Sequence, residues 1–273
     1  MNFGICLLSV IPCRKEASST SEMVTQLLFG ETYQIIENGE DWLKIITTFD
    51  NYQCWISRKQ SFEISENEFK KIEPSVLNSE LVQVIVNNQN ETVFPITIGA
   101  TLPNFANNLI SIGSSSFTFE GNTINSSHKK NTQELKQTAY LFLNAPYLWG
   151  GKSPFGIDCS GFTQLVFKIN GYKLPRDASQ QVELGHPLSF VEEAMPGDLA
   201  FFDNEEGNII HVGLIIDNQQ IIHASGCVRI DKFDQIIHAS GSVRIDKFDH
   251  YGIFNTDTKK YSHMLRVIKR IIE

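Results

Sequence analysis

The stretch GIDCSGF, residues 156–162, places a thiol where a loop rich in Gly and Pro turns into an amphipathic helix. Beyond the thiol, apolar residues recur at the i, i+3, i+4 and i+7 spacing of one helical face: Phe162, Leu165, Val166 and Ile169. Cys159 then lies in the first turn, where unpaired backbone N–H groups and the helix dipole favour a thiolate. The stretch predicts a nucleophilic cysteine, and a buried structural cysteine is the alternative.

The composition is typical of a globular protein with an acidic surface. The chain has 273 residues, 41% of them hydrophobic, with a net charge of -8 and a pI near 5.4. This charge argues against nucleic acid as the main ligand, because a nucleic-acid site needs a basic patch. The five cysteines are odd in number and lack CxxC spacing, so neither a disulfide framework nor a zinc site is expected. A reducing compartment fits them best.

The apolar start of the chain, residues 1–13, raises the question of a signal peptide. It has no Lys or Arg before its apolar run, which a signal peptide requires, so a first β-strand is expected and export is the alternative. No run of about 18 apolar residues occurs, and no membrane partner is expected. The expected location is the cytoplasm.

Residues 1–70 consist of short apolar runs separated by turn residues, the pattern of a small β-barrel. The expected strands are Gly4–Ile11, Val24–Phe29, Thr32–Glu37, Trp42–Thr48 and Gln53–Ile56. The order of motifs such as LLFGE (27–31), WLKI (42–45) and YQCWI (52–56) resembles a bacterial SH3-like domain. A second β-rich segment, residues 75–126, predicts a second SH3-like module.

After a polar linker at 125–130, the apolar spacing changes to that of a helix beginning near Asn131 or Thr132. The Cys159 helix follows, and then strands are expected at Leu199–Phe202 and Ile209–Ile216. Helices followed by consecutive strands are typical of an α+β domain with an antiparallel sheet. We assign this domain to residues 130–273.

Two histidines in consecutive strands offer what a cysteine nucleophile needs, a base and a group that orients the base. His211 begins one strand, and His223 lies in the next. Opposed residues of an antiparallel pair share a face, so a three-residue loop, Asp217–Gln219, would place His223 opposite Gly213 and diagonal to His211. A two-residue loop would place His223 opposite Leu214, on the wrong face. The pattern therefore predicts a loop of odd length.

Taken together, six motifs resemble the NlpC family of papain-like cysteine peptidases, which cut bacterial cell-wall peptides. They are PYLWGG (146–151), DCSGF (158–162), LPRDASQQ (174–181), PGDL (196–199), HVG (211–213) and IHA (222–224). The resemblance implies an α+β chain, in which two small SH3-like β-barrels precede a papain-like domain with an antiparallel sheet. It implies Cys159 as nucleophile, His211 as base and His223 as the group that orients His211. Tyr147 would stabilise the oxyanion beside the backbone N–H of Cys159.

The tandem SH3-like modules resemble those of relatives that cleave after γ-D-glutamate in short peptides with a free N-terminal L-alanine. In that subgroup the acid matching Asp177 pairs with the substrate ammonium, whose charge is costly to bury unpaired. An aromatic residue of the first SH3-like domain closes the pocket, and we choose Tyr52 over Trp55. Helix or turn capping is the alternative for Asp177 and for Asp158. The matching motifs imply substrate contacts for Trp149, Asp158, Ser160, Arg176 and Ser179.

A tandem copy interrupts the family pattern, because QIIHASGCVRIDKFD (220–234) is followed by QIIHASGSVRIDKFD (235–249). The copy is too short and isolated for a solenoid repeat. It supplies His238 as an alternative to His223. We favour His223, because use of His238 would loop out the whole first copy. One copy is expected to be extruded or to displace the other. The remaining histidines are expected on the surface or in loops: His128, His186, His250 and His263.

The sequence thus predicts a cysteine endopeptidase that hydrolyses the γ-D-glutamyl-diamino acid bond of murein peptides during their recycling. Neither a metal nor an organic cofactor is expected, and the expected partner is the murein peptide. Two alternatives stay open. One is a non-catalytic protein that binds wall peptides, and the other is a thioester acyltransferase that passes the acyl group to another amine or to a lipid. Oligomeric state and the third substrate residue, lysine or diaminopimelate, are left open.

Overall fold

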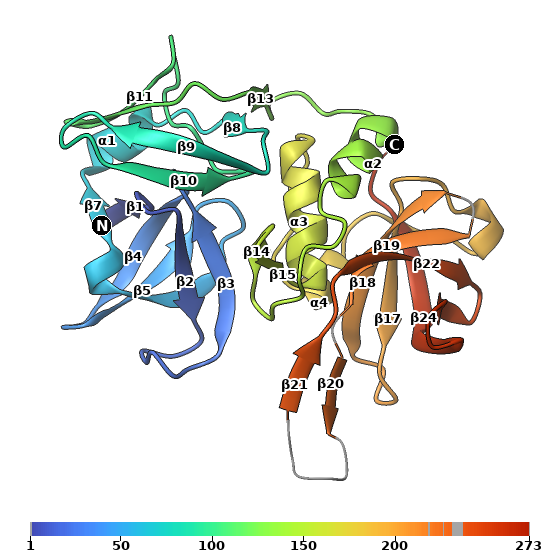
Figure 1. Cartoon of the computed structure of the whole chain (residues 1–273). Helices are drawn as coiled ribbons and strands as arrows, with labels where there is room; N and C mark the ends of the chain where they lie inside the picture. The colour runs from blue at the N-terminus through green and yellow to red at the C-terminus, as the bar shows by residue number, and fades with distance from the viewer. Residues whose placement is uncertain (1, 218, 226, 231–236, 273) are drawn as a thin grey trace. The chain divides into compact units, whose positions relative to one another are not determined.

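The computed structural model describes residues 2–217, 219–225, 227–230 and 237–272, and only the backbone of 227–230 and 237–240. The contacts divide the chain into two compact units (Figure 1). The first comprises 1–129, 150–154 and 171–173, and the second comprises 130–149, 155–170 and 174–273. No helix in the described ranges is long and apolar enough to cross a membrane.

Short strands dominate the first unit. Its elements are β1 Asn2–Ile5, β2 Val10–Arg14, β3 Met23–Leu28, β4 Thr32–Asn38, β5 Trp42–Thr47, β6 Gln53–Ser57, η1 Arg58–Gln60, β7 Phe62–Ile64, α1 Glu66–Lys71, β8 Val76–Asn78, β9 Val82–Asn87, β10 Val93–Thr97, β11 Leu109–Ile112, β12 Ser115–Thr118, β13 Thr123–Asn125 and β14 Lys152–Ser153. Seven strands form an antiparallel sheet in the order β3-β2-β6-β5-β4-β1-β7, and four form a sheet in the order β10-β9-β12-β11. This is the SH3-like region expected from the sequence.

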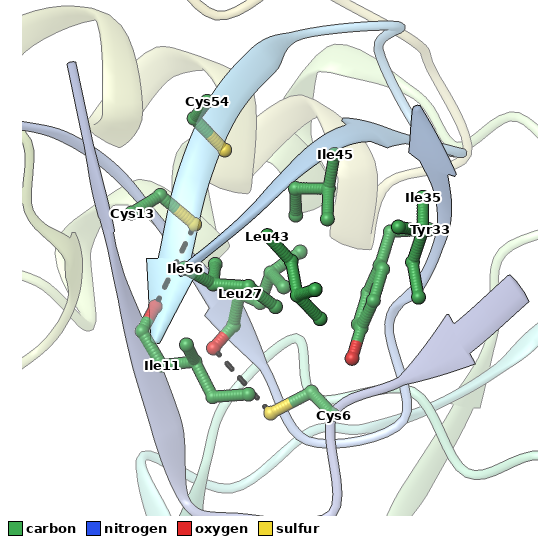
Figure 2. Close-up of a cluster of buried hydrophobic side chains, with 10 residues drawn as sticks. All are labelled: Cys6, Ile11, Cys13, Leu27, Tyr33, Ile35, Leu43, Ile45, Cys54 and Ile56. Carbon is green, nitrogen blue, oxygen red and sulfur yellow. Dashed lines mark hydrogen bonds between the residues drawn. The ribbon is translucent and has the colours of Figure 1, made fainter. Parts of the chain in front are cut away.

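Alternation along the strands builds the core of the seven-stranded sheet. In β5 the side chains of Leu43 and Ile45 are buried, whereas Trp42 and Lys44 on the opposite face are partly exposed. Figure 2 shows the inward-facing cluster, which consists of Cys6, Ile11, Cys13, Leu27, Tyr33, Ile35, Leu43, Ile45, Cys54 and Ile56. Burial of this apolar surface is the main force that stabilises the sheet.

The expected strand Gly4–Ile11 is in fact two strands. β1 pairs with β4 and β7, whereas β2 pairs with β3 and β6, so residues 6–9 carry the chain between two parts of the sheet. The apolar run hid this break because Ile5 and Ile11, on its two sides, are both fully buried. Apolar periodicity reports burial and says little about where a strand changes its partner.

The second unit combines a buried helix with an antiparallel sheet. Its elements are α2 Thr132–Tyr140, β15 Gly156–Ile157, α3 Cys159–Ile169, α4 Ala178–Gln181, β16 His186–Pro187, η2 Val191–Glu193, β17 Leu199–Asp203, β18 Ile209–Asp217, β19 Gln220–Ala224, β20 Cys227–Ile230, β21 Ile237–Ser240, β22 Val243–Asp249, β23 Gly252–Asn255 and β24 Lys260–Arg270. The sheet order is β16-β24-β17-β18-β19-β22-β23, and β23 also pairs with β24. That extra pairing closes six strands into a barrel, and the α+β fold class predicted from the sequence is confirmed.

Helix α3 is the buried centre of this unit. Asp158 is its N-cap, which is why the helix begins at Cys159, and every residue of the helix is buried. The apolar face predicted from the sequence includes Phe162, whose ring meets that of Phe142 edge to face with centroids 5.9 Å apart. The helix also packs on β18, which brings the thiol of its first turn to the sheet that carries His211.

The tandem copy is divided between two sheets. β19 comes from the start of the first copy and β22 from the end of the second, and they pair with Ala224 opposite Val243. Between them, β20 and β21 pair only with each other (Figure 1), and residues 226 and 231–236 lie outside the described residues. The expectation that one whole copy leaves the sheet is therefore wrong. Because the copies are nearly identical, β22 of the second copy can pair with β19 of the first in the register that the two halves of a single copy would have.

Candidate active site

Cys159 lies in the first turn of α3, held there by the cap of the helix. The carboxylate of Asp158 accepts a hydrogen bond from the backbone N–H of Gly161 at 2.7 Å. The Cys159 side chain is 8% exposed, so it lies just below the surface. The backbone at Val212, the residue after His211, is within hydrogen-bonding reach of the thiol. The start of α3 and the start of β18 are thus adjacent in the fold.

A buried network of hydrogen bonds holds the first turn of α3 in place. Arg176, 1% exposed, donates to both carboxylate oxygens of Asp158, from Nη1 at 3.0 Å and from Nη2 at 2.6 Å. The same Nη1 donates to Ser160 Oγ at 2.9 Å. The Gln181 side chain, from α4, donates to the carbonyl oxygen of Ser160 at 3.0 Å. The bidentate contact orients the helix start firmly. The bond from Gly161 N–H shows that Asp158 caps α3, the alternative given for this residue.

The thiol of Cys159 is neutral in this environment. Burial, together with the neighbouring Asp158 carboxylate, raises its pKa to about 12, and the Val212 backbone and Arg176 offset this rise only in part. The thiolate expected from the position at the helix start is therefore not the resting form. Because desolvation penalises the charged form, the thiol needs a nearby base at the moment of reaction.

His211 and His223 form a hydrogen-bonded pair across β18 and β19. Nε2 of His211 lies 2.8 Å from Nδ1 of His223, and the two rings meet at 83° with centroids 5.0 Å apart. Both side chains are buried. Burial lowers the pKa of each ring, and for His211 the neighbouring histidines lower it further, so both are neutral at pH 7.

The register of the hairpin places His223 as predicted, but the loop differs. β18 ends at Asp217 and β19 begins at Gln220, so the odd loop is wrong, and residue 218 lies outside the described residues. A β-bulge between Ile215 and Asp217 supplies the odd residue instead. Beyond the bulge, Leu214 faces Ile222, which puts His223 opposite Gly213. A Cβ atom at Gly213 would lie 2.6 Å from Ile221 Cδ1 and 3.1 Å from His223 Cβ, so glycine leaves the room that both side chains occupy.

Two residues that the sequence did not single out, Asp246 and His263, complete the cluster. Asp246 of β22 lies beneath His223, with Oδ2 3.3 Å from Nε2 of that ring. His263 of β24 stacks on His211 with centroids 4.1 Å apart and 22° between the planes. It is partly buried, so its expected place on the surface or in a loop is wrong. Neither residue stands in one of the six motifs. Asp246 reaches His223 through the pairing of β19 with β22, and His263 reaches His211 because β24 and β18 both pair with β17.

The three histidines have nitrogen atoms within 4.8 Å of one another, which raises the question of a metal ion. A ligating nitrogen directs its lone pair in the plane of its ring. The rings of His211 and His263 are stacked with 22° between their planes, so their in-plane lone pairs run side by side and the two planes meet only at a distance from the rings. The 2.8 Å bond between His211 and His223 would also have to break. This arrangement fits a base with its orienting partner better than a metal centre.

The buried histidines predict that acid destabilises the protein below about pH 6.5. Burial lowers the pKa of His263 to about 4 and lowers those of His211 and His223, so below pH 6.5 the unfolded chain takes up protons that the folded chain does not. Each ring contributes a slope of at most about 1.4 kcal/mol per pH unit, with stability rising with pH. Urea unfolding between pH 4.5 and 7 checks this. His263→Phe should reduce the slope, and an equal slope in both proteins would contradict the prediction.

Tyr147 is fixed through its backbone. Its N–H donates to the carbonyl oxygen of Gly241 at 2.8 Å, and the residue forms a parallel bridge with Ile157, two residues before Cys159. Its side chain is partly exposed. Its predicted role at the oxyanion stays a prediction.

The other residues expected to contact substrate differ in setting. Asp177 is the partly exposed N-cap of α4, and Ser179 is exposed in that short helix. Trp149 is 55% exposed, whereas Asp158, Ser160 and Arg176 are buried and bonded to one another. Tyr52, in the first unit, is partly buried against the cluster of Figure 2. Their contacts with substrate stay predictions.

The second copy of the tandem repeat places His238 away from the pair. His238 belongs to β21, where its partner on β20 is Arg229, and its side chain lies outside the described residues. His223, in contrast, is in the barrel sheet and bonds to His211. Of the two candidates for the third position, the geometry thus favours the first copy.

Comparison with known proteins agrees with this architecture. Residues 144–253 match the NlpC/P60 family, and residues 13–60 match the bacterial dipeptidyl-peptidase SH3 domain. A gamma-D-glutamyl-L-lysine dipeptidyl-peptidase of Bacillus subtilis (strain 168) is 30% identical over 215 residues, which cover 73% of this chain and 71% of the relative. A protein of the same name from Bacillus cereus is 28% identical over 232 residues, covering 76% and 68%.

A solved structure extends the similarity to the whole chain. The crystal structure of an NlpC/P60 family protein from Bacillus cereus has a TM-score of 0.82 and covers 99% of this chain and 100% of its own. At 20% sequence identity this likeness shows the fold.

Proposed function

The chain belongs to the NlpC/P60 family of cysteine peptidases, and from that premise we propose that it hydrolyses the γ-D-glutamyl-diamino acid bond of cell-wall-derived peptides with a free N-terminal L-alanine. The observation that carries this proposal is the packing of α3 on β18: the backbone of Val212 lies within hydrogen-bonding reach of the Cys159 thiol, and the preceding residue, His211, bonds to His223. The name shared by the two Bacillus relatives, gamma-D-glutamyl-L-lysine dipeptidyl-peptidase, supports the choice of bond.

In this proposal Cys159 is the nucleophile and His211 the base. Nε2 of His211 bonds to His223, which leaves Nδ1 to take the thiol proton. As Sγ attacks the γ-carbonyl carbon of D-glutamate, the proton passes to Nδ1 and a tetrahedral oxyanion forms. The imidazolium then returns the proton to the leaving amine of the diamino acid, which gives a thioester and a free amine. Water, deprotonated by His211, cleaves the thioester and restores the thiol.

The pKa values of the two groups fit this order of events. Burial is the main cause that raises the pKa of the Cys159 thiol to about 12. Burial and the neighbouring histidine rings lower the pKa of His211 well below its usual range, so both groups are neutral at rest. Charge separates only as the bond forms, when the backbone N–H of Cys159 and the hydroxyl of Tyr147 are proposed to stabilise the oxyanion. A neutral resting thiol also limits unwanted oxidation, because the thiolate is the reactive form.

Substrate selection is proposed to depend on Asp177. Its carboxylate is partly exposed at the start of α4, next to the loop that carries Arg176. A carboxylate there would pair with the N-terminal ammonium of L-alanine, a charge that is costly to desolvate alone. Trp149, Ser179 and Tyr52 are proposed to contact the rest of the peptide.

Acetylating the substrate amine should therefore greatly reduce cleavage. The peptide L-Ala-γ-D-Glu-L-Lys should be cut to L-Ala-γ-D-Glu and lysine, whereas its N-acetyl form should lose about 30-fold or more in kcat/KM, since leaving one member of a buried charge pair alone costs about 2–5 kcal/mol. Mass spectrometry of the products measures this, and the diaminopimelate peptide in parallel gives the preference at the third residue.

The matched variant is Asp177→Asn. Asparagine caps a helix as well as aspartate does, so α4 should start at the same residue while the charge is lost. The variant should cleave the free-amine peptide about as poorly as the wild type cleaves the acetylated one. Equal kcat/KM for the free and acetylated peptides in the wild type would show that Asp177 does not bind the N-terminal ammonium of the substrate.

We further propose that the protein acts in the cytoplasm, in the recycling of murein peptides. Four cysteines whose side chains are described are free, namely Cys6, Cys13, Cys54 and Cys159, as is usual for proteins of a reducing compartment. Fractionation of cells followed by immunoblotting tests the location. Recovery of the protein outside the membrane would contradict it.

A further inference from the structure

The carboxylate of Asp246 is the buried end of the hydrogen-bond chain that passes through both histidines. Asp246 is 2% exposed, and its Oδ2 lies 3.3 Å from Nε2 of His223. Its Oδ1 accepts from Arg244 Nη2 at 3.0 Å and from both the backbone N–H and the hydroxyl of Thr256 at 3.3 Å, and Arg244 Nε lies 2.7 Å from Oδ2. The chain of contacts is therefore His211, His223, Asp246 and then Arg244 with Thr256.

These contacts keep Asp246 ionised. Burial alone would raise its pKa, but the hydrogen bonds from His223, Arg244 and Thr256 outweigh this and lower the pKa to about 2. An ionised carboxylate only accepts hydrogen bonds. The proton between Asp246 and His223 must therefore lie on Nε2 of His223.

The position of that proton determines which ring nitrogens of His223 and His211 are protonated. His223 is neutral, so with a proton on Nε2 its Nδ1 can only accept. Nε2 of His211, 2.8 Å away, must then carry a proton and donate it. The free lone pair of His211 is left on Nδ1, the nitrogen that a base for Cys159 requires. If His223 carried its proton on Nδ1 instead, Nε2 of His211 would have to accept that hydrogen bond. The proton of His211 would then lie on its own Nδ1, which could not accept the thiol proton.

We propose that Asp246 is a positioning residue that fixes the tautomers of His223 and His211, so that His211 presents an unprotonated Nδ1 to Cys159. A third residue that is itself a histidine leaves two tautomers open, because either ring nitrogen can carry its proton. Asp246 removes this ambiguity from the side remote from the thiol. It also faces the positive charge that develops on His211 during catalysis. The inference rests on the proposed function, in which His211 is the base.

The two copies of the tandem repeat each contribute a residue to this series of hydrogen bonds. His223 belongs to the first copy and Asp246 to the second, and they meet because β19 of one copy pairs with β22 of the other. Each copy alone contains both residue types at the same spacing, His223 with Asp231 and His238 with Asp246. The chain thus provides its own matched control, since Asp231 stands in the first copy where Asp246 stands in the second.

Ring-nitrogen NMR of the whole protein labelled with 15N-histidine tests the inference without any substrate. Long-range 1H–15N spectra distinguish a protonated from an unprotonated ring nitrogen, and single His→Gln variants assign the rings. At pH 7 we expect both His223 and His211 to carry the proton on Nε2. A proton on Nδ1 of His223 in the wild type would overturn the inference, whatever the activity of the enzyme. The expected tautomers in a protein that does not cut peptides would instead count against the proposed function alone.

The variants Asp246→Asn and Asp231→Asn add the kinetic readout. An Asp-to-Asn change that gives the wrong histidine tautomer lowers kcat by about 10⁴-fold in a serine protease. Because Asp246 acts here through a second ring, we expect a fall in kcat of about 100-fold with KM within about twofold, and a mixture of tautomers at His223. Asp231→Asn should match the wild type in kcat and in its spectrum. A fall in kcat with the His223 tautomer unchanged, or equal losses in both variants, would overturn the proposal.

Discussion

Replacing Cys159 by alanine should reduce hydrolysis of L-Ala-γ-D-Glu-L-Lys by roughly 10⁴-fold or more, because loss of a nucleophile removes the covalent route and leaves only binding and oxyanion stabilisation. The fold should survive the change. Cys159 begins a helix whose start is held by Asp158, Arg176 and Gln181, and the thiol is not part of that network. Product release followed by mass spectrometry measures the activity, and thermal unfolding measures the fold.

The chain offers a natural control for this variant. The tandem copies differ only where Cys227 of the first is replaced by Ser242 of the second, so Cys227→Ser is a change that the sequence already tolerates. It should leave the rate unchanged. Activity above about 1% in Cys159→Ala would exclude Cys159 as nucleophile, since the residual rate expected without a nucleophile is far lower.

The same variant separates the three functional classes. A wall-peptide binding protein would bind the tripeptide equally well with or without the Cys159 thiol, and neither form would cut it. An acyltransferase would need Cys159 but would give the amide of an added amine in preference to the free acid. Only a peptidase releases the free γ-carboxylate in a reaction that depends on Cys159.

The sequence predicted the parts of the site that depend on local pattern. The apolar spacing from Phe162 to Ile169 predicted α3, because a helix buried against a sheet needs that face. The parity of antiparallel pairing predicted that His223 lies opposite Gly213, because only then can it reach His211. Both rest on geometric periods that hold in any fold.

The parts that the sequence did not predict depend on long-range pairing. The bulge near Ile216 did what the odd loop was expected to do, and neither turn residue nor glycine marks it. His263 reaches His211 only because the last strand, β24, pairs with β17, which lies between it and β18. Asp246 could not be told from Asp231, because a tandem copy offers two equivalent residues and only the pairing of β19 with β22 selects between them.

The tandem copy leads to the second large effect, a difference between two histidines in identical local sequences. His223→Ala should lower kcat by about 10³-fold, because His211 loses the partner that holds its ring and its tautomer. His238→Ala should leave kcat within about twofold, since in the described ranges β21 pairs with β20 and not with the barrel sheet. Steady-state kinetics on the tripeptide measure both. A larger loss for His238 would mean that the second copy supplies the third residue in solution.

Deleting residues 226–240 provides the control for the repeat itself. The deletion joins Ser225 to Gly241 and leaves one complete copy, QIIHASGSVRIDKFD. The ends are already close, because the N–H of Ser225 donates to the carbonyl oxygen of Ser242 at 3.2 Å and Ala224 pairs with Val243. A three-residue loop should therefore close the hairpin with His223 and Asp246 in place, and activity should be kept. Since closing a shorter loop costs less entropy, the shortened protein should also unfold at a temperature no lower than the wild type. Loss of activity in a folded deletion variant would show that the extra residues take part in catalysis.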